Sequence, residues 1–112
     1  MKKTIFLMIL LLGLSFLMAH PPTEMNITFN EEELLLTIVI EHNVNNPGNH
    51  YIDQLTIQHG RNELVVHKMS RQDDNDSVTL VYRLPDVQSG MKLNIVASCN
   101  RIGRLTREFE IE

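Results

Sequence analysis

The stretch Tyr51-Ile-Asp-Gln-Leu-Thr-Ile-Gln-His-Gly-Arg-Asn-Glu-Leu-Val-Val-His-Lys68 predicts two β-strands joined by a tight turn. Residues 51–58 alternate between polar and apolar, which is the period of a half-buried strand. The turn is expected at His59-Gly60-Arg61-Asn62, and residues 63–68 form the returning strand. The candidate core residues of the first strand are Ile52, Leu55 and Ile57.

Five further segments have the same character as this hairpin. Each is short, rich in alternating or β-branched residues, and bounded by turn residues such as Asn, Gly and Pro. They cover residues 25–29, 33–41, 77–84, 91–98 and 104–111, while residues 70–76 are expected to form a solvated acidic loop. About seven short strands without a convincing helix predict an all-β protein with an immunoglobulin-like β-sandwich fold.

The first 19 residues have the pattern of a secretory signal peptide. Lys2 and Lys3 precede an apolar stretch that ends at Ala19, and a proline pair follows at once. The stretch is short for a membrane span, so we expect cleavage after Ala19 and no stable membrane association afterwards. The prediction is a signal peptide at 1–19, a single domain at 20–112, and a periplasmic or secreted location in a bacterial or archaeal cell envelope.

The charge and the cysteine content narrow the possible partners. Without the first 19 residues, 8 basic residues face 14 acidic ones, which argues against binding to nucleic acid or to an anionic membrane. The single cysteine, Cys99, cannot form an internal disulfide. In a secreted domain such a thiol is a metal ligand, a reactive group or half of an intermolecular bridge, and a homo-oligomer is therefore possible.

Three histidines and Cys99 are candidate metal ligands. His42 and His50 lie at the two ends of a turn-rich loop, His20 precedes Pro21-Pro22, and Cys99 follows the strand expected at 91–98. Each also has a simpler interpretation, because His20 could belong to a disordered terminus, His42 could be an ordinary loop residue, and His50 could cap a strand. Cys99 could be a small buried apolar residue. His59 and His67 are expected to be surface residues.

These motifs resemble the iron-binding domain of superoxide reductases, the neelaredoxin and desulfoferrodoxin family. The resemblance rests on His20-Pro21-Pro22, on the loop that ends in His50-Tyr51-Ile52, and on Cys99-Asn100 followed by Gly103. It spans residues 20–112 in order and spacing, at low identity. It implies an immunoglobulin-like sandwich that binds one mononuclear non-haem iron through His20, His42, His50 and an axial Cys99 thiolate, with Cys99 and His50 as the catalytic residues.

The resemblance also implies reduction of superoxide to hydrogen peroxide, with electrons from an unidentified donor. The chain departs from the family pattern at Ile102, where a fourth histidine is expected, and at Ala19, where the family has a lysine. Three imidazoles and one thiolate also suit zinc, and copper is possible. The alternative is therefore a non-catalytic module that binds a metal or a partner after the loss of one iron ligand at Ile102.

Overall fold

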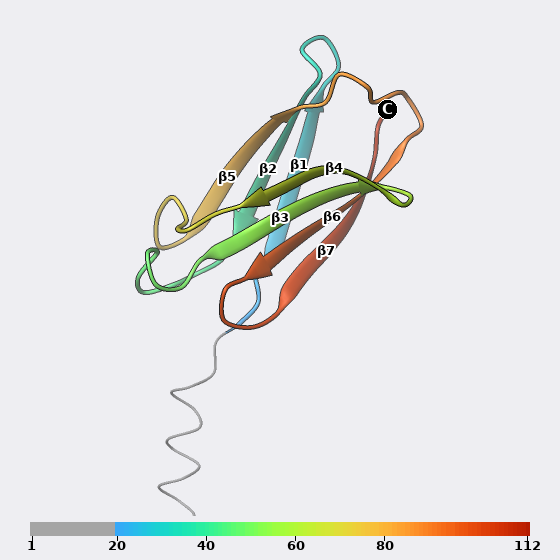
Figure 1. Cartoon of the computed structure of the whole chain (residues 1–112). Helices are drawn as coiled ribbons and strands as arrows, with labels where there is room; N and C mark the ends of the chain where they lie inside the picture. Colours follow the sequence, from blue (N-terminus) through green and yellow to red (C-terminus); the bar gives the residue numbers. More distant parts are fainter. Residues whose placement is uncertain (1–19) are drawn as a thin grey trace, which may run out of the picture.

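The computed structural model describes residues 20–112, and the predicted signal peptide at 1–19 lies outside this range. The described residues form seven β-strands and no helix (Figure 1). None of them belongs to a helix long and apolar enough to cross a membrane. The strands are β1 (Glu24–Asn30), β2 (Leu35–Glu41), β3 (Ile52–His59), β4 (Asn62–Lys68), β5 (Ser77–Arg83), β6 (Lys92–Cys99) and β7 (Arg104–Glu110).

The strands form two antiparallel sheets, which Figure 1 shows as the two layers of a sandwich. One sheet has the order β1-β2-β5 and the other the order β4-β3-β6-β7. In a constant-type immunoglobulin domain the fourth strand joins the sheet of the first two. Here β4 pairs with β3 instead, because the turn between them closes a tight hairpin. The predicted all-β sandwich of about seven strands is confirmed.

Alternate residues of β2 and β6, together with Ile52, Leu55 and Ile57 of β3, build most of the core. In β2 the fully buried residues are Leu36, Ile38 and Ile40, and in β6 they are Leu93, Ile95 and Ala97. Side chains of a strand point alternately to opposite faces, so these residues share the inward face of their sheets. The next inward positions, His42 and Cys99, are also buried and lie at one end of the core.

The structure corrects three predictions, two on where strands begin or end and one on the exposure of a loop. Residues 33–34 belong to a turn rather than to β2, and Leu34 has φ 58°, where a strand residue has a negative φ. The turn between β3 and β4 shrinks to Gly60 and Arg61, because residues 59 and 62 pair with each other. The loop at 70–76 is not uniformly solvated, since Gln72 is only 1% exposed.

His67 is also less exposed than expected. It is half-buried on β4, and its Nδ1 lies 2.7 Å from the hydroxyl of Tyr82 on β5. These two strands are edges of opposite sheets, so the hydrogen bond links the two layers. His59, at the far end of β3 from His50, is half-buried as well.

Candidate metal centre

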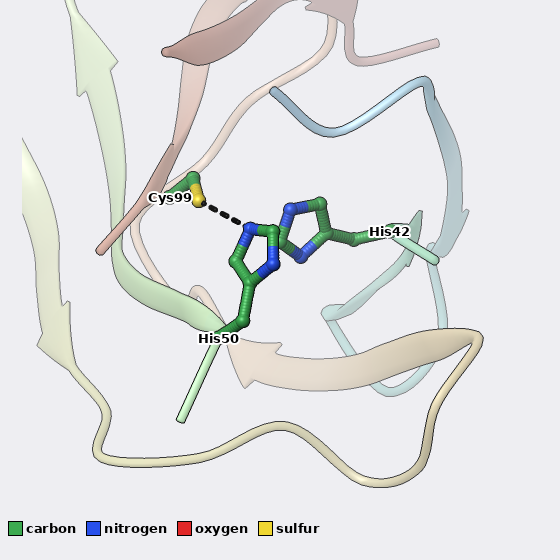
Figure 2. Close-up of side chains that lie close together, drawn as sticks. All are labelled: His42, His50 and Cys99. Atoms are coloured by element: carbon green, nitrogen blue, oxygen red, sulfur yellow. Dashed lines mark hydrogen bonds between the residues drawn. The ribbon is translucent and has the colours of Figure 1, made fainter. Parts of the chain in front are cut away.

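Three predicted ligands meet at one end of the sandwich. Figure 2 shows His42, His50 and Cys99 with their functional groups turned toward one another. One ligand atom from each lies within 4.8 Å of the other two, and all three side chains are buried. They come from the end of β2, from the residue pair before β3 and from the end of β6, so segments far apart in sequence converge here.

Cys99 is the last inward position of β6. Its Sγ lies 3.2 Å from Nε2 of His50 and accepts a hydrogen bond from the backbone N–H of Arg101 at 3.4 Å. The turn after the strand is closed by the N–H of Cys99, which donates to the carbonyl of Gly103. Donation of an N–H to the sulfur stabilises a thiolate, the form in which cysteine binds metals.

His42 is held by Gln72, a buried residue of the loop that was expected to be solvated. The side-chain Nε2 of Gln72 donates to the carbonyls of His42 and Asp74, at 2.8 and 3.0 Å. These two acceptors identify the amide nitrogen, so the amide oxygen faces Nδ1 of His42 at 2.9 Å. An amide oxygen only accepts, and Nδ1 of His42 therefore carries a proton while Nε2 points into the site.

This arrangement is the usual one for a metal-binding imidazole. A ligating histidine commonly donates its second ring N–H to a carbonyl or a carboxylate, which fixes both the tautomer and the ring orientation. The sequence contained no signal for this role, because Gln72 lies in a polar loop that also contains the amide of Asn75.

His50 is positioned by Asn100, the residue after the cysteine. The backbone N–H of Asn100 donates to the carbonyl of Tyr51, and the N–H of Tyr51 donates to the side-chain oxygen of Asn100 at 2.9 Å. The side-chain nitrogen of Asn100 donates to the carbonyl of Asn49 at 3.0 Å. These bonds bracket His50 on both sides and tie its loop to the end of β6.

The environment of His50 favours the neutral imidazole. Burial lowers its pKa below the usual 6.5, and the nearby His42, the charge of Arg101 and His20 lower the pKa further. Neutral imidazole is the form that coordinates metal ions. His50 is therefore ready to bind a metal at neutral pH without first losing a proton.

His20 lies beside the two buried imidazoles but is exposed. Its ring centroid is 5.2 Å from that of His42 and 5.4 Å from that of His50. His20 is not part of the group formed by His42, His50 and Cys99. Its Nδ1 lies 3.1 Å from the carbonyl oxygen of Pro21. The structure thus brings all three predicted histidines together, with His20 at the margin.

The position of His20 depends on a contact between Pro21 and Gly103. A Cβ on Gly103 would lie 2.7 Å from Cβ of Pro21, and Gly103 has φ 86°. Only glycine combines this backbone conformation with such a close approach. Gly103 therefore lets the N-terminal segment rest on the turn that follows the cysteine.

The donor set fits a first-row transition metal. Nitrogen and sulfur ligands lie about 2.1 and 2.3 Å from a bound zinc ion, so two such atoms of one site are less than about 4.4 Å apart. Sγ of Cys99 and Nε2 of His50 are 3.2 Å apart, so an ion would need little rearrangement of this pair. Imidazole and thiolate together suit iron, copper or zinc.

The remaining predicted positions contribute no ligand to this cluster. Ile102 is 58% exposed, so the turn carries an apolar side chain where the family pattern has a histidine. His59 and His67 belong to other parts of β3 and β4. Among residues 20–112, His42, His50 and Cys99 form the metal-ligand group.

Comparison with known proteins places the fold. No family model and no curated protein matches the chain. Among solved structures the chain is similar to a superoxide reductase (neelaredoxin) from Ignicoccus hospitalis, with 17% sequence identity and a TM-score of 0.50. The similarity covers 81% of this chain and 80% of that chain. At this identity the similarity concerns the fold alone.

Proposed function

We propose that the chain is an exported mononuclear iron protein that reduces superoxide to hydrogen peroxide. One observation carries the proposal: a cysteine and two buried histidines converge at one end of a sandwich that is folded like a superoxide reductase. The ligands are His42, His50 and Cys99, with His20 completing the set. The location is the periplasm or the cell exterior, after removal of residues 1–19.

The reaction adds one electron and two protons to superoxide and yields one hydrogen peroxide, with the electron coming from an external donor. Iron, when bound, supplies this electron to the substrate, and an electron-donating thiolate favours the transfer. Cys99 provides that thiolate, and its sulfur accepts a hydrogen bond from the backbone N–H of Arg101. Gln72 and Asn100 hold the two buried imidazoles in place.

Arg101 also supplies positive charge to the site. The domain has 14 acidic residues against 8 basic ones and would repel an anion such as superoxide. The charge of Arg101 acts on His50, since it is one of the causes that lower the pKa of this residue. In this proposal Arg101 attracts the superoxide anion, as the guiding cation that the family pattern supplies with a lysine at the position of Ala19.

The test is metal content and visible absorption, followed by turnover. Wild type loaded with iron should show a thiolate-to-metal charge-transfer band when oxidised, and Cys99→Ala should lack the band. With a reductant present, one hydrogen peroxide should form for each superoxide consumed, whereas a dismutase forms one for every two. Arg101→Gln should slow the reaction and weaken its dependence on salt. Iron-loaded protein without superoxide consumption would refute the proposed reaction.

A second function is favoured by the exposed Ile102. With an apolar side chain at this turn, the imidazole donors are His20, His42 and His50, and three imidazoles with one thiolate also make a tetrahedral zinc site. The protein would then be a non-catalytic metal-binding or partner-binding module. Protein isolated with zinc, without a visible band and without superoxide consumption, would support this function over the reductase.

A further inference from the structure

We propose that the α-amine of His20 is itself a ligand of the metal, and that it takes the place of the donor missing at Ile102. The proposal rests on the metal centre proposed above and on cleavage between Ala19 and His20. An internal residue has an amide nitrogen, which is not basic. Cleavage at this bond would therefore create a metal ligand.

The main chain of His20 lies beside His42. Its carbonyl oxygen is 3.2 Å from Nε2 of His42, the nitrogen that the Gln72 hydrogen bond leaves facing the ligand cluster. The nitrogen of His20 is attached to the same Cα as this carbonyl group. The new N-terminus would therefore begin beside the ligands rather than at a distance from them.

The contact between His42 and His20 places residue 20 beside a candidate ligand atom. Nδ1 of His42 faces the amide oxygen of Gln72, so Nε2 is the ring nitrogen left for a metal, and it lies 3.2 Å from the carbonyl oxygen of His20. A metal bound to Nε2 of His42 would therefore also lie close to residue 20.

The lead-in segment is anchored on both sides of the site. Pro21 rests on Gly103, which follows Ile102 in the chain, so the lead-in segment contacts the turn that carries Ile102. Further along, the N–H of Thr23 donates to the carbonyl of Glu41 at 2.9 Å, next to His42. Pro22 is buried between these two anchors. This anchoring reduces the entropy that residue 20 would lose on binding a metal.

An amine and an imidazole of the same residue can bind one ion together as a chelate. An α-amine has a pKa of about 7.7–8.0, so a metal displaces its proton readily near neutral pH. The ring of His20 would have to turn, because its Nδ1 now lies near the carbonyl of Pro21. That contact is exposed and local, so the rotation costs little.

The experiment compares two proteins that differ by one residue at the N-terminus. Residues 20–112 contain all seven strands and the whole core, so each protein can be released from an N-terminal fusion by a protease. One begins at His20 and the other carries an additional alanine before His20. The readouts are the affinity for Co²⁺ and Fe²⁺ and the visible spectrum of the Co²⁺ form. Mass spectrometry of the full chain, exported from a bacterial host, identifies the natural N-terminus.

We expect the additional alanine to weaken Co²⁺ binding about 10-fold or more and to change the spectrum, because a ligand is lost. In the extended protein, Ile102→His should restore the affinity, since it returns an imidazole to the same turn. Equal affinities and spectra for the two proteins would overturn the inference while leaving the metal centre intact. A natural N-terminus other than His20, or an Ile102→His variant without rescue, would also overturn it. Failure of both proteins to bind any metal would refute the proposed function and the inference together.

Discussion

Gly103→Ala should damage the proposed metal centre through Pro21, without changing a candidate ligand. The new Cβ would lie 2.7 Å from Cβ of Pro21 and 3.2 Å from its Cα, so the lead-in segment has to move. The movement would carry His20 away from the other imidazoles. The variant therefore tests whether metal binding depends on the position of His20, because it moves this residue and leaves its amine and imidazole unchanged.

Gly90→Ala is a matched control. Gly90 has φ 88° and Gly103 has φ 86°, but a Cβ on Gly90 would meet no atom within 4 Å. Gly90 precedes β6, whereas Gly103 follows it, so the control lies at the other end of the strand from the ligands. Both variants carry the same backbone penalty of about 1–2 kcal/mol for an alanine in this conformation.

The difference between the two variants measures the contact with Pro21. Overpacking costs about 1–3 kcal/mol, so Gly103→Ala should destabilise the metal-free protein by that much more than Gly90→Ala does. It should also weaken metal binding about 10–100-fold, while Gly90→Ala should leave the affinity unchanged. Urea denaturation gives the free energies of unfolding, and competition with a chromophoric chelator gives the affinities.

A second substitution tests the stated cause. Pro21→Gly removes the nearest atom from the contact, so its combination with Gly103→Ala should recover much of the lost stability. Equal destabilisation by Gly103→Ala and Gly90→Ala, with unchanged metal affinity in both, would refute the argument. The N-terminal segment would then be held by something other than its contact with this glycine.

Three further results are expected. Gln72→Leu should weaken metal binding about 10–100-fold and cost about 1–3 kcal/mol of stability, because it leaves the buried Nδ1–H of His42 without an acceptor; unchanged metal affinity would exclude this role. The lowered pKa of His50 means that below pH 6.5 the unfolded state binds a proton that the folded state does not. The free energy of unfolding of metal-free protein should therefore fall as the pH falls below 6.5, and denaturant titrations of His50→Ala should show a smaller fall. Burial raises the pKa of Tyr82 to about 12, so an absorbance titration of the phenols should contain a step near this pH that Tyr82→Phe removes. The stability of wild type should then decline as the pH rises above 10, where the unfolded chain loses the phenolic proton first.

The local pattern of the chain was sufficient to predict the fold. Strands such as β5 and β6 are encoded by alternation over seven or eight residues, and this period alone separates an inward from an outward face. The same alternation continues through Ile38 and Ile40 to His42, and through Ile95 and Ala97 to Cys99. The alternation therefore already indicated that His42 and Cys99 are buried. Their prediction as metal ligands rested instead on position in the chain and on the family resemblance.

The surroundings of the candidate ligands could not be predicted in this way. Gln72 is 30 positions from His42, and only the packing of the loop before β5 against the end of β2 brings the two together. Asn100 reaches back to residues 49 and 51 because β3 and β6 are neighbours in one sheet. Local propensity contains no information about such pairings, since they depend on strand order and register.

The sequence by itself thus determined the number of strands, the inward face of each and the residue types available for metal binding, because these follow from period and composition. Tertiary structure alone decided that His42, His50 and Cys99 share one end of the core. It also decided that Gln72 sets the tautomer of His42, and that Gly103 leaves room for Pro21 and so places His20 beside the other imidazoles. These contacts depend on the pairing of the two sheets, and the pairing is a property of the whole chain rather than of any single segment.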